Sequence, residues 1–388
     1  MQRRAGPLSQ LRRGHEELVL GLLRRHGPLS RAQLGTHSGL SRTTLHDIVN
    51  ALLGSGAVVT QHVAPTGGRG RPAETITLNP DAGQAIGIDF ARRAVHVAIV
   101  NVAHEIVGTA TEAHAEDLPW EERAELAERL VGGLAEGTLR LGALSAIGAG
   151  VVGPVGDADP GHEREALLRK RFGVPVLLDN NTRLAALAES IWGAAAGHRD
   201  VLYLRLSHGV GGGLVVGGAL HRGAHGLSGE FGHITVDPDG EPCGCGGTGC
   251  LETVASIGAV LTAYREAGGD AGDLTGLLTA LESGDPAAEQ VFAEVGRQVG
   301  TVLAALCNAI GPGLIVLGGE LAEAGQALSG PIETALSRHL LPISQPKVVL
   351  RRAGLGDTGG ALGGIALVLH ESPLLSHYPA EPDLGEDR

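Results

Sequence analysis

The spacing of apolar residues divides the chain into a short helical head and a longer body. Up to about residue 55, apolar positions recur at the three- and four-residue intervals of amphipathic helices. Gly27 and Gly39 interrupt this pattern, and Ser30 and Ser41 are good N-caps for the segments that follow. The pattern predicts three helices, over 15–26, 31–37 and 42–53, and two strands, over 57–63 and 74–78.

From residue 84 the pattern changes to strands that alternate with helices. Short apolar runs predict strands over 85–89, 95–100, 106–110, 146–151, 174–178, 201–206, 213–216 and 314–317. Longer periodic segments predict helices over 121–140, 182–195, 258–267, 287–310 and 359–370. This alternation in two halves predicts an α/β fold with two lobes and a ligand-binding cleft between them.

Composition sets further limits on the class of protein. The chain has 388 residues, 43 % of them hydrophobic, which is enough for two or three domains with real cores. The sequence shows no basic start followed by an apolar core, so we expect no signal peptide. No apolar run is long enough to span a bilayer. The four cysteines are few, which fits a reducing cytoplasm. The acidic, proline-rich residues 372–388 are typical of a disordered tail.

The net charge of −13 is unevenly distributed along the chain. Residues 1–80 hold ten arginines and four acidic residues, a net charge of +6, whereas the remainder carries −19. An acidic protein with a basic head indicates that only the head meets a polyanion such as DNA.

Three cysteines and one histidine form the most specific motif of the sequence. His233, Cys243, Cys245 and Cys250 are arranged as His-x9-Cys-x-Cys-x4-Cys in a glycine-rich stretch. Three thiolates and one imidazole complete the tetrahedral shell of a structural Zn²⁺. The alternatives are four unrelated residues or a disulfide, and we favour zinc because so many soft ligands fall so close together. Cys307 lies in an apolar helical run and is interpreted as a buried small side chain.

The order of elements in the head predicts a winged helix-turn-helix. Its third helix offers four side chains near the N-terminus, where a recognition helix meets base edges: Arg42, Thr43, Thr44 and His46. The turn between the two strands contains Arg69 and Arg71 on a glycine scaffold, suited to phosphates or a minor groove. The alternative is a plain three-helix bundle with a basic linker. The predicted wing and the change from a basic head to an acidic body favour binding to double-stranded DNA over this alternative.

The body resembles the ROK family of sugar kinases and repressors, which has the two-lobed actin/hexokinase-like fold. The resemblance covers nearly the whole chain, and the zinc motif is its most specific part. With the head included, the chain is similar to the repressor branch of the family. We accordingly expect a winged helix-turn-helix in residues 1–80, a first lobe in 81–198 completed by the C-terminal helix 357–371, and a second lobe in 199–356.

The resemblance also implies a carbohydrate site. Its residues would be Asn180, Asn181, Glu230, His233 and Glu252, whose donors and acceptors suit sugar hydroxyls. Asn181 stands where the family's kinases have the aspartate that acts as general base, and an amide cannot take that role. The family's phosphate loop, Asp-x-Gly-Gly-Thr, is replaced by Asp89-Phe90-Ala91-Arg92-Arg93. Both departures argue against phosphotransfer, so we expect no enzyme activity.

A shortened segment of the chain allows more than one hypothesis about the ligand. Only the residues 155–171 separate Pro154 from Phe172, about half of what the resemblance leads us to expect, so one wall of the sugar site is missing. Three hypotheses follow: a repressor that senses a mono- or oligosaccharide, a sugar kinase with an accessory DNA-binding head, and a regulator with a vestigial ligand site. Operator DNA in palindromic half-sites would call for a homodimer or tetramer.

Overall fold

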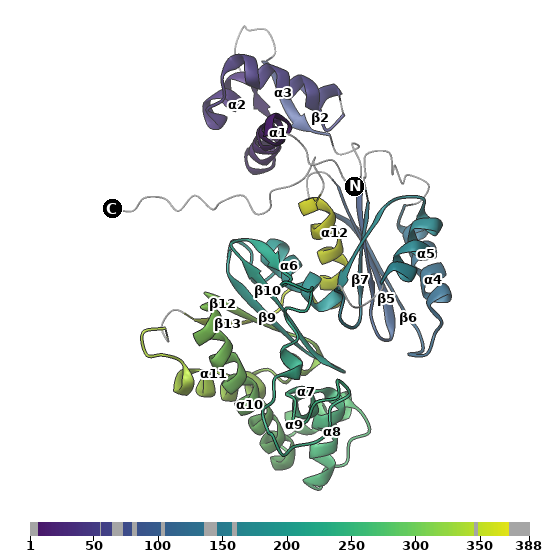
Figure 1. Ribbon diagram of the computed structural model, residues 1–388, viewed down its shortest axis with the longest axis vertical. Coiled ribbons are helices and arrows are strands. Elements are labelled where there is room, and N and C mark those ends of the chain that lie inside the picture. The colour runs from purple at the N-terminus through teal and green to yellow at the C-terminus, as the bar shows by residue number, and fades with distance from the viewer. Residues whose placement is uncertain are drawn as a thin grey trace.

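The computed structural model describes residues 7–54, 56–63, 73–79, 84–101, 105–135, 146–156, 161–344 and 348–371. The predicted wing turn, with Arg69 and Arg71, and the predicted tail 372–388 lie outside the described residues. The remaining chain forms three sheets with helices packed against them (Figure 1). No described helix has both the length and the apolar character needed to cross a membrane.

The head is a three-helix unit with a small antiparallel sheet in the order β1-β3-β2. Ser30 caps the second helix in a capping box with Gln33, and Gly39 ends it with a left-handed φ of 66°. Leu45, Ile48 and Val49 turn into the head's core. The elements are α1 Pro7–His26, β1 Leu29–Ser30, α2 Arg31–Ser38, α3 Arg42–Gly54, β2 Val58–Val63 and β3 Ala73–Leu78.

The first lobe is built on a five-stranded sheet in the order β6-β5-β4-β7-β8. The first three strands of that order are antiparallel, and the last two join in parallel. Helices α4 and α5 pack on one face, and α6 and α12 lie on the other (Figure 1). The elements are β4 Gln84–Phe90, β5 Ala94–Asn101, β6 Ile106–Ala113, α4 Trp120–Ala135, β7 Ile147–Val151, α5 His162–Phe172, β8 Val176–Asn180, α6 Asn181–Trp192 and α12 Gly359–Glu371.

The second lobe has its own five-stranded sheet, in the order β11-β10-β9-β12-β13. Its largest helix, α10, packs against α11 and contributes much of a core that includes Phe292 and Leu303. The elements are β9 Val201–Leu206, β10 Val210–Val216, β11 Ala219–His221, α7 Glu252–Ala255, α8 Ile257–Glu266, α9 Leu274–Glu282, α10 Pro286–Ile310, β12 Leu314–Gly318, α11 Gln326–His339 and β13 Val349–Arg352, with three 3₁₀ turns, η2 Phe231–His233, η3 Glu320–Ala324 and η5 Gly356–Thr358.

Helix α12 comes from the far end of the chain and lies directly on the first lobe's sheet. A Cβ atom added at Gly148 would lie 1.8 Å from the carbonyl oxygen of Gly364, and one added at Gly87 would lie 1.8 Å from that of Ala361. These positions therefore need glycine for close backbone approach. The contact fixes α12 at the base of the cleft, beside β4 and β7.

The predicted alternation of strands and helices is confirmed, with shifts of a few residues at element ends. Helix α1 begins eight residues before the predicted start at His15, and α4 is described only to Ala135. The sequence reasoning missed β1, α5, β11, α7, α9, α11 and β13. Helix α5 falls within the shortened segment 155–171, where no element was predicted, so part of that segment is ordered structure that packs on β8.

Candidate functional site

A polar cleft of about 370 Å³ is lined by residues of both lobes. Strand ends and turns of the first lobe supply one wall, and the glycine-rich turn between β9 and β10 supplies another. All five residues predicted to bind a carbohydrate line this one cleft: Asn180, Asn181, Glu230, His233 and Glu252. Their role in binding stays a prediction, but the fold does bring them together from segments up to 72 positions apart.

Asn180 has a structural task that occupies most of its amide. Its side-chain oxygen caps helix α6 by accepting from the backbone N–H groups of Thr182 and Arg183, at 2.9 and 3.0 Å. Its Nδ2 donates to the Gly153 carbonyl oxygen at 2.8 Å. One amide hydrogen is left for a ligand. Asn180 therefore contributes more to the shape of the cleft than to the recognition of a ligand.

Asn181 is held against a buried carboxylate. Its Nδ2 donates to Asp89 Oδ1 at 3.0 Å, and Asp89 is only 1 % exposed. Burial raises the pKa of Asp89, while the charges of Arg205 and His96 and the Asn181 hydrogen bond oppose that rise. Among the described residues, Asp89 Oδ2 has no hydrogen-bond partner. An aspartate in place of Asn181 would set two carboxylates against each other, so the amide suits this pair.

Glu230, His233 and Glu252 come from the loop that follows β11 and from the start of α7. Glu252 Oε2 accepts from the backbone N–H of Val210 at 2.8 Å, which ties it to the glycine-rich turn. No hydrogen bond joins the Glu230 carboxylate to another residue within the described ranges, and Glu230 is half-buried. Its two oxygens are therefore available as acceptors in the cleft.

The two arginines of the loop that replaces the family's phosphate loop share one acidic partner. Glu116 bridges to Arg92 at 2.9 Å and to Arg93 at 3.3 Å, all on the surface. The hydrogen bond from Arg92 is the main cause of the lowered pKa of Glu116. Both arginines line the cleft and share the single carboxylate of Glu116, which compensates one of their two charges.

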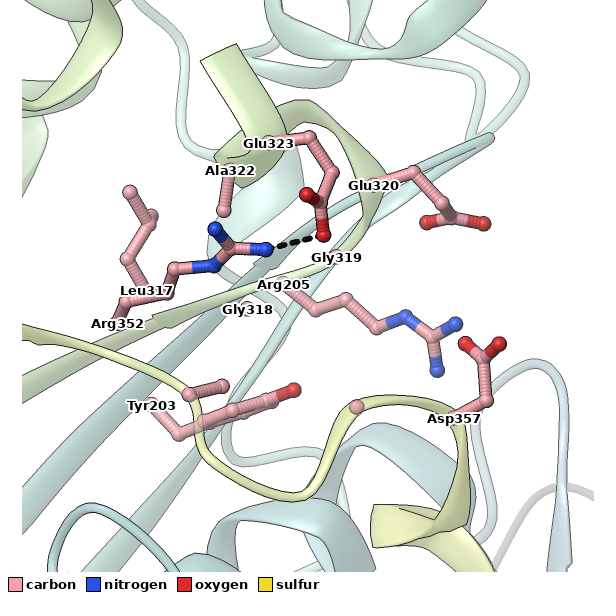
Figure 2. A pocket seen from close by; sticks show the side chains of 12 residues that line it. Tyr203, Arg205, Leu317, Gly318, Gly319, Glu320, Ala322, Glu323, Arg352 and Asp357 are labelled. Atoms are coloured by element: carbon pink, nitrogen blue, oxygen red, sulfur yellow. Dashed lines mark hydrogen bonds and ion pairs between the residues drawn. The ribbon is translucent and has the colours of Figure 1, made fainter. Parts of the chain in front are cut away.

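A second, smaller pocket of about 180 Å³ continues from the cleft past Arg205 (Figure 2). The Arg205 side chain extends across it, and its guanidinium faces Asp357, with Glu320 close by. Across the pocket Arg352 and Glu323 form an ion pair. Tyr203 lines the pocket as well, and burial raises the pKa of its hydroxyl to about 12. The charges of Asp89, Glu320 and Asp357 act on the Arg205 guanidinium.

The predicted metal ligands converge to a single point. One ligand atom from each of His233, Cys243, Cys245 and Cys250 lies within 4.8 Å of all the others. The Sγ atoms of Cys245 and Cys250 are 3.7 Å apart, and Cys243 Sγ lies 3.6 Å from His233 Nδ1. A tetrahedral zinc with bonds of about 2.3 Å to sulfur and 2.0 Å to nitrogen needs separations of roughly 3.5–3.8 Å. The donor set and its dimensions therefore fit Zn²⁺.

Tight turns shape this cluster. The Cys243 N–H donates to the Gly247 carbonyl, and the Gly246 N–H donates back to that of Cys243. Gly249 has a φ of 62°, and a Cβ there would lie 1.5 Å from the Asp237 carbonyl oxygen. The fourth cysteine, Cys307, is buried in the core of the second lobe as predicted, where burial raises its pKa to about 11.

A buried ion network, which the sequence reasoning missed, joins the two lobes. Asp179 is 2 % exposed and accepts from Arg183 Nε at 2.8 Å and from Arg222 Nε at 2.5 Å. Arg183, itself 1 % exposed, also donates to the carbonyls of Val155 in the first lobe and of Gly226 in the second. Five donors in one plane suit such a junction. No local spacing could have revealed it, because its partners are up to 43 residues apart.

The head presents one exposed stripe on α3. Arg42, Thr43 and His46 are exposed along it, while the opposite side of the helix is buried. Thr44 is half-buried, and its hydroxyl lies 2.8 Å from that of Ser41, which caps the helix. Three of the four predicted base-reading residues are thus free to meet DNA directly, whereas Thr44 already helps to begin the helix.

A helix-turn-helix head joined to a two-lobed body with a polar cleft defines a sugar-kinase-like regulator architecture. The chain belongs to the ROK family, whose family model matches residues 85–371. The DNA-binding transcriptional dual regulator NagC of Escherichia coli K12 is 29 % identical over 95 % of both chains. A glucokinase of Halalkalibacterium halodurans is 38 % identical, but over only 52 % of this chain and 66 % of its own length.

A solved structure is similar over the head and the body together. It is described as a ROK family transcriptional regulator, a homologue of the E. coli Mlc protein, with a TM-score of 0.80 and 25 % identity. The similarity covers 94 % of this chain and 98 % of that one. Repressors therefore match the full length, whereas the glucokinase matches part of it.

The inter-lobe network yields a stability prediction. Replacing Arg183 with Met removes a buried donor from Asp179 and from the carbonyls of Val155 and Gly226. Because these acceptors would lose that partner, we expect a loss of about 3–5 kcal/mol in the free energy of unfolding. The matched control is Arg169→Met, because Arg169 pairs with Glu165 at the same i,i+4 spacing on the surface. That change should cost about 0.5 kcal/mol or less. Denaturant unfolding measures both, and equal costs would contradict the network's role.

Proposed function

We propose that this protein is a DNA-binding transcriptional repressor whose kinase-like body senses a carbohydrate and has lost phosphotransfer. The observation that carries the proposal is the full-length similarity to ROK repressors, which includes the head that kinases of the family lack. Because its partner is operator DNA, we place the protein in the cytoplasm. A homodimer or tetramer would present paired heads to a palindromic operator.

DNA contact is assigned to the exposed stripe of α3 and to the wing. Arg42, Thr43 and His46 offer a cation, a hydroxyl and an imidazole on one helix face. We assign Arg69 and Arg71, on sequence grounds alone, to phosphate or minor-groove contact. The +6 charge of residues 1–80 supports this assignment, since the rest of the chain repels DNA.

Salt-dependent DNA binding tests the proposal. Arg69→Ala and Arg71→Ala should each weaken binding to all sequences, and each should reduce the slope of log K against log salt by about 1. Arg265→Ala, an exposed arginine on α8 of the body, is the matched control and should leave the slope unchanged. Fluorescence anisotropy of the full-length protein with duplex DNA gives both values. Absence of salt-dependent affinity would refute the DNA-binding assignment.

The loss of phosphotransfer is supported from both sides of the cleft. Asn181 offers no general base, and its amide is engaged with Asp89. On the nucleotide side, Arg92 and Arg93 are paired with Glu116, and Arg205 extends across the adjoining pocket. A working kinase would need both a general base and a phosphate site that is open to ATP.

We expect turnover with ATP and a panel of hexoses to stay well below about 1 s⁻¹, the lower end of ordinary enzymes. Asn181→Asp alone should not restore it, because the loop Asp89–Arg93 still lacks the glycines and the threonine of the family's phosphate loop. A coupled ADP-release assay, run beside a working ROK glucokinase, measures this. A rate near 1 s⁻¹ for the unaltered protein would overturn the proposal in favour of a kinase with an accessory head.

We assign the His233, Cys243, Cys245 and Cys250 cluster to structural Zn²⁺. All four tetrahedral positions are protein ligands, so no position is left for a substrate or water. When bound, the ion would hold the loop that runs from Glu230 to Glu252. His233 and Cys250 would fix its two ends, and the cleft carboxylates flank them directly.

Elemental analysis of the purified protein should give about one zinc per chain. Cys245→Ser should lose the metal and lower the melting temperature, because the binding free energy of a structural zinc contributes to folding. Cys307→Ser is the matched control, since it removes a buried thiol outside the cluster and should retain the zinc. Metal-free protein with unchanged melting temperature would contradict the assignment.

A carbohydrate effector is supported by the acceptors that the cleft leaves available. Glu230 and Glu252 provide carboxylate oxygens, and Asn181 and Asn180 line the opposite wall. The alternative is a regulator with a vestigial ligand site. The shortened segment before α5 favours that alternative, and both hypotheses predict the same DNA binding.

Glu252→Gln should abolish any response of operator affinity to sugar while retaining DNA binding and zinc. An amide keeps the shape but exchanges one acceptor for a donor, which costs about 1–3 kcal/mol where a hydroxyl donor is left unpaired. Glu241→Gln is the control, since Glu241 lies exposed in the same loop. Isothermal titration with a panel of mono- and oligosaccharides measures binding. If no sugar binds the wild type or shifts its operator affinity, the vestigial-site hypothesis replaces the sensor.

A further inference from the structure

Two side-chain hydrogen bonds link the exposed stripe of α3 to the start of α2. Asn50 Nδ2 lies 2.9 Å from His46 Nε2, one helical turn earlier on the same helix. Arg31 Nη2, from the first residue of α2, donates to Asn50 Oδ1 at 3.2 Å. His46 and Asn50 are both exposed, and Arg31 is half-buried.

The donor-only chemistry of arginine fixes the polarity of this chain of hydrogen bonds. A guanidinium cannot accept, so the Asn50 atom that faces Arg31 is the amide oxygen. The Asn50 atom that faces His46 is then the amide nitrogen, which donates. His46 Nε2 must accept, so the neutral ring carries its proton on Nδ1.

The hydrogen bonds from Arg31 through Asn50 to His46 form a relay between two helices, and both helices are well anchored. Arg31 follows Ser30, whose capping box with Gln33 sets the first turn of α2. On the other side Leu45, Val49 and Leu52 bury the inner face of α3 in the head's core. The relay therefore spans two helices whose relative positions the core fixes, so the orientation of the His46 ring is set before DNA arrives.

We propose that Asn50 is a specificity-determining residue, which holds His46 in the tautomer with the proton on Nδ1. Arg31 acts through it as a positioning residue. The inference rests on the proposed DNA-binding function. In the major groove an Nδ1–H donor favours bases with acceptors, guanine above all, since it offers both O6 and N7. It disfavours cytosine, whose edge offers an N4 donor.

An isosteric change at Asn50 reverses the polarity. Asn50→Asp replaces the amide nitrogen with an oxygen, and a carboxylate only accepts. Arg31 still donates to it, but His46 must now donate from Nε2, which leaves Nδ1 as an acceptor. The base preferred at this position should change from guanine to cytosine or adenine, which present amino donors. The added negative charge weakens binding to every sequence alike and so cancels in a ratio of affinities.

The test is selection of full-length protein on randomised duplex DNA at pH 8, followed by affinity measurements on paired operators that differ at one base. We expect the ratio of guanine to cytosine affinity at one position per half-site to fall at least about tenfold in Asn50→Asp. In a His46→Ala background the same change should have no effect on that ratio, because the ring that reads the base is gone.

Asp47→Asn is the matched control. Asp47 is exposed on the same turn of α3 as His46, and the substitution is the same isosteric exchange in reverse. It should alter affinity for all sequences without changing the preferred base. Zinc content and melting temperature of each variant confirm that the chain is folded.

Two results would overturn the relay: an unchanged base preference in Asn50→Asp, or a change that persists in the His46→Ala background. Both leave the DNA-binding function intact, because binding itself is still observed. Failure of the wild type to bind any duplex at low salt is a separate outcome, which refutes the proposed function and with it the relay.

Discussion

The arrangement of the cleft depends on one buried guanidinium, that of Arg183. It lies at the start of α6, pairs with Asp179 on β8 and reaches backbone carbonyls of both lobes. Burying two charges is expensive, and only the additional hydrogen bonds make the pair favourable. Those bonds hold the loop that leads from β11 to Glu230. The orientation of the residues predicted to bind a carbohydrate therefore depends on the Arg183–Asp179 ion pair, which is not itself among those residues.

The same cleft keeps its shape although residues of the family's kinase pattern are replaced. Asp89 remains, but its neighbour is an amide. In the loop after it, Ala91 and Arg92 stand in place of the two glycines and Arg93 in place of the threonine. Arg205 and its acidic neighbours line the adjoining pocket. Asn181, Arg92 and Arg93 all bond to carboxylates of the protein itself. The lobes stay joined, and the cleft remains available to a ligand that need only bind.

Local chemistry could be predicted from the sequence, and long-range contacts could not. The metal ligands lie within 18 residues, so their spacing alone indicated the cluster, and the caps Ser30 and Gly39 act over a single turn. Asn181 meets Asp89 across 92 positions, and nothing in the spacing of either residue signals that hydrogen bond. The role of Asn180 as a helix cap was missed for a different reason, since a resemblance assigned it to a ligand first.

The placement of α12 has a consequence for how the chain matures on the ribosome. The first lobe's sheet begins at residue 84, but the helix that covers its inner face spans residues 359–371. At ordinary rates of translation, the hydrophobic side of that sheet waits on the order of tens of seconds for its cover. The head has emerged complete by then, and so has the second lobe up to β13. A nascent chain can thus possess a finished helix-turn-helix before it possesses a cleft, and a truncated product would keep the first without the second.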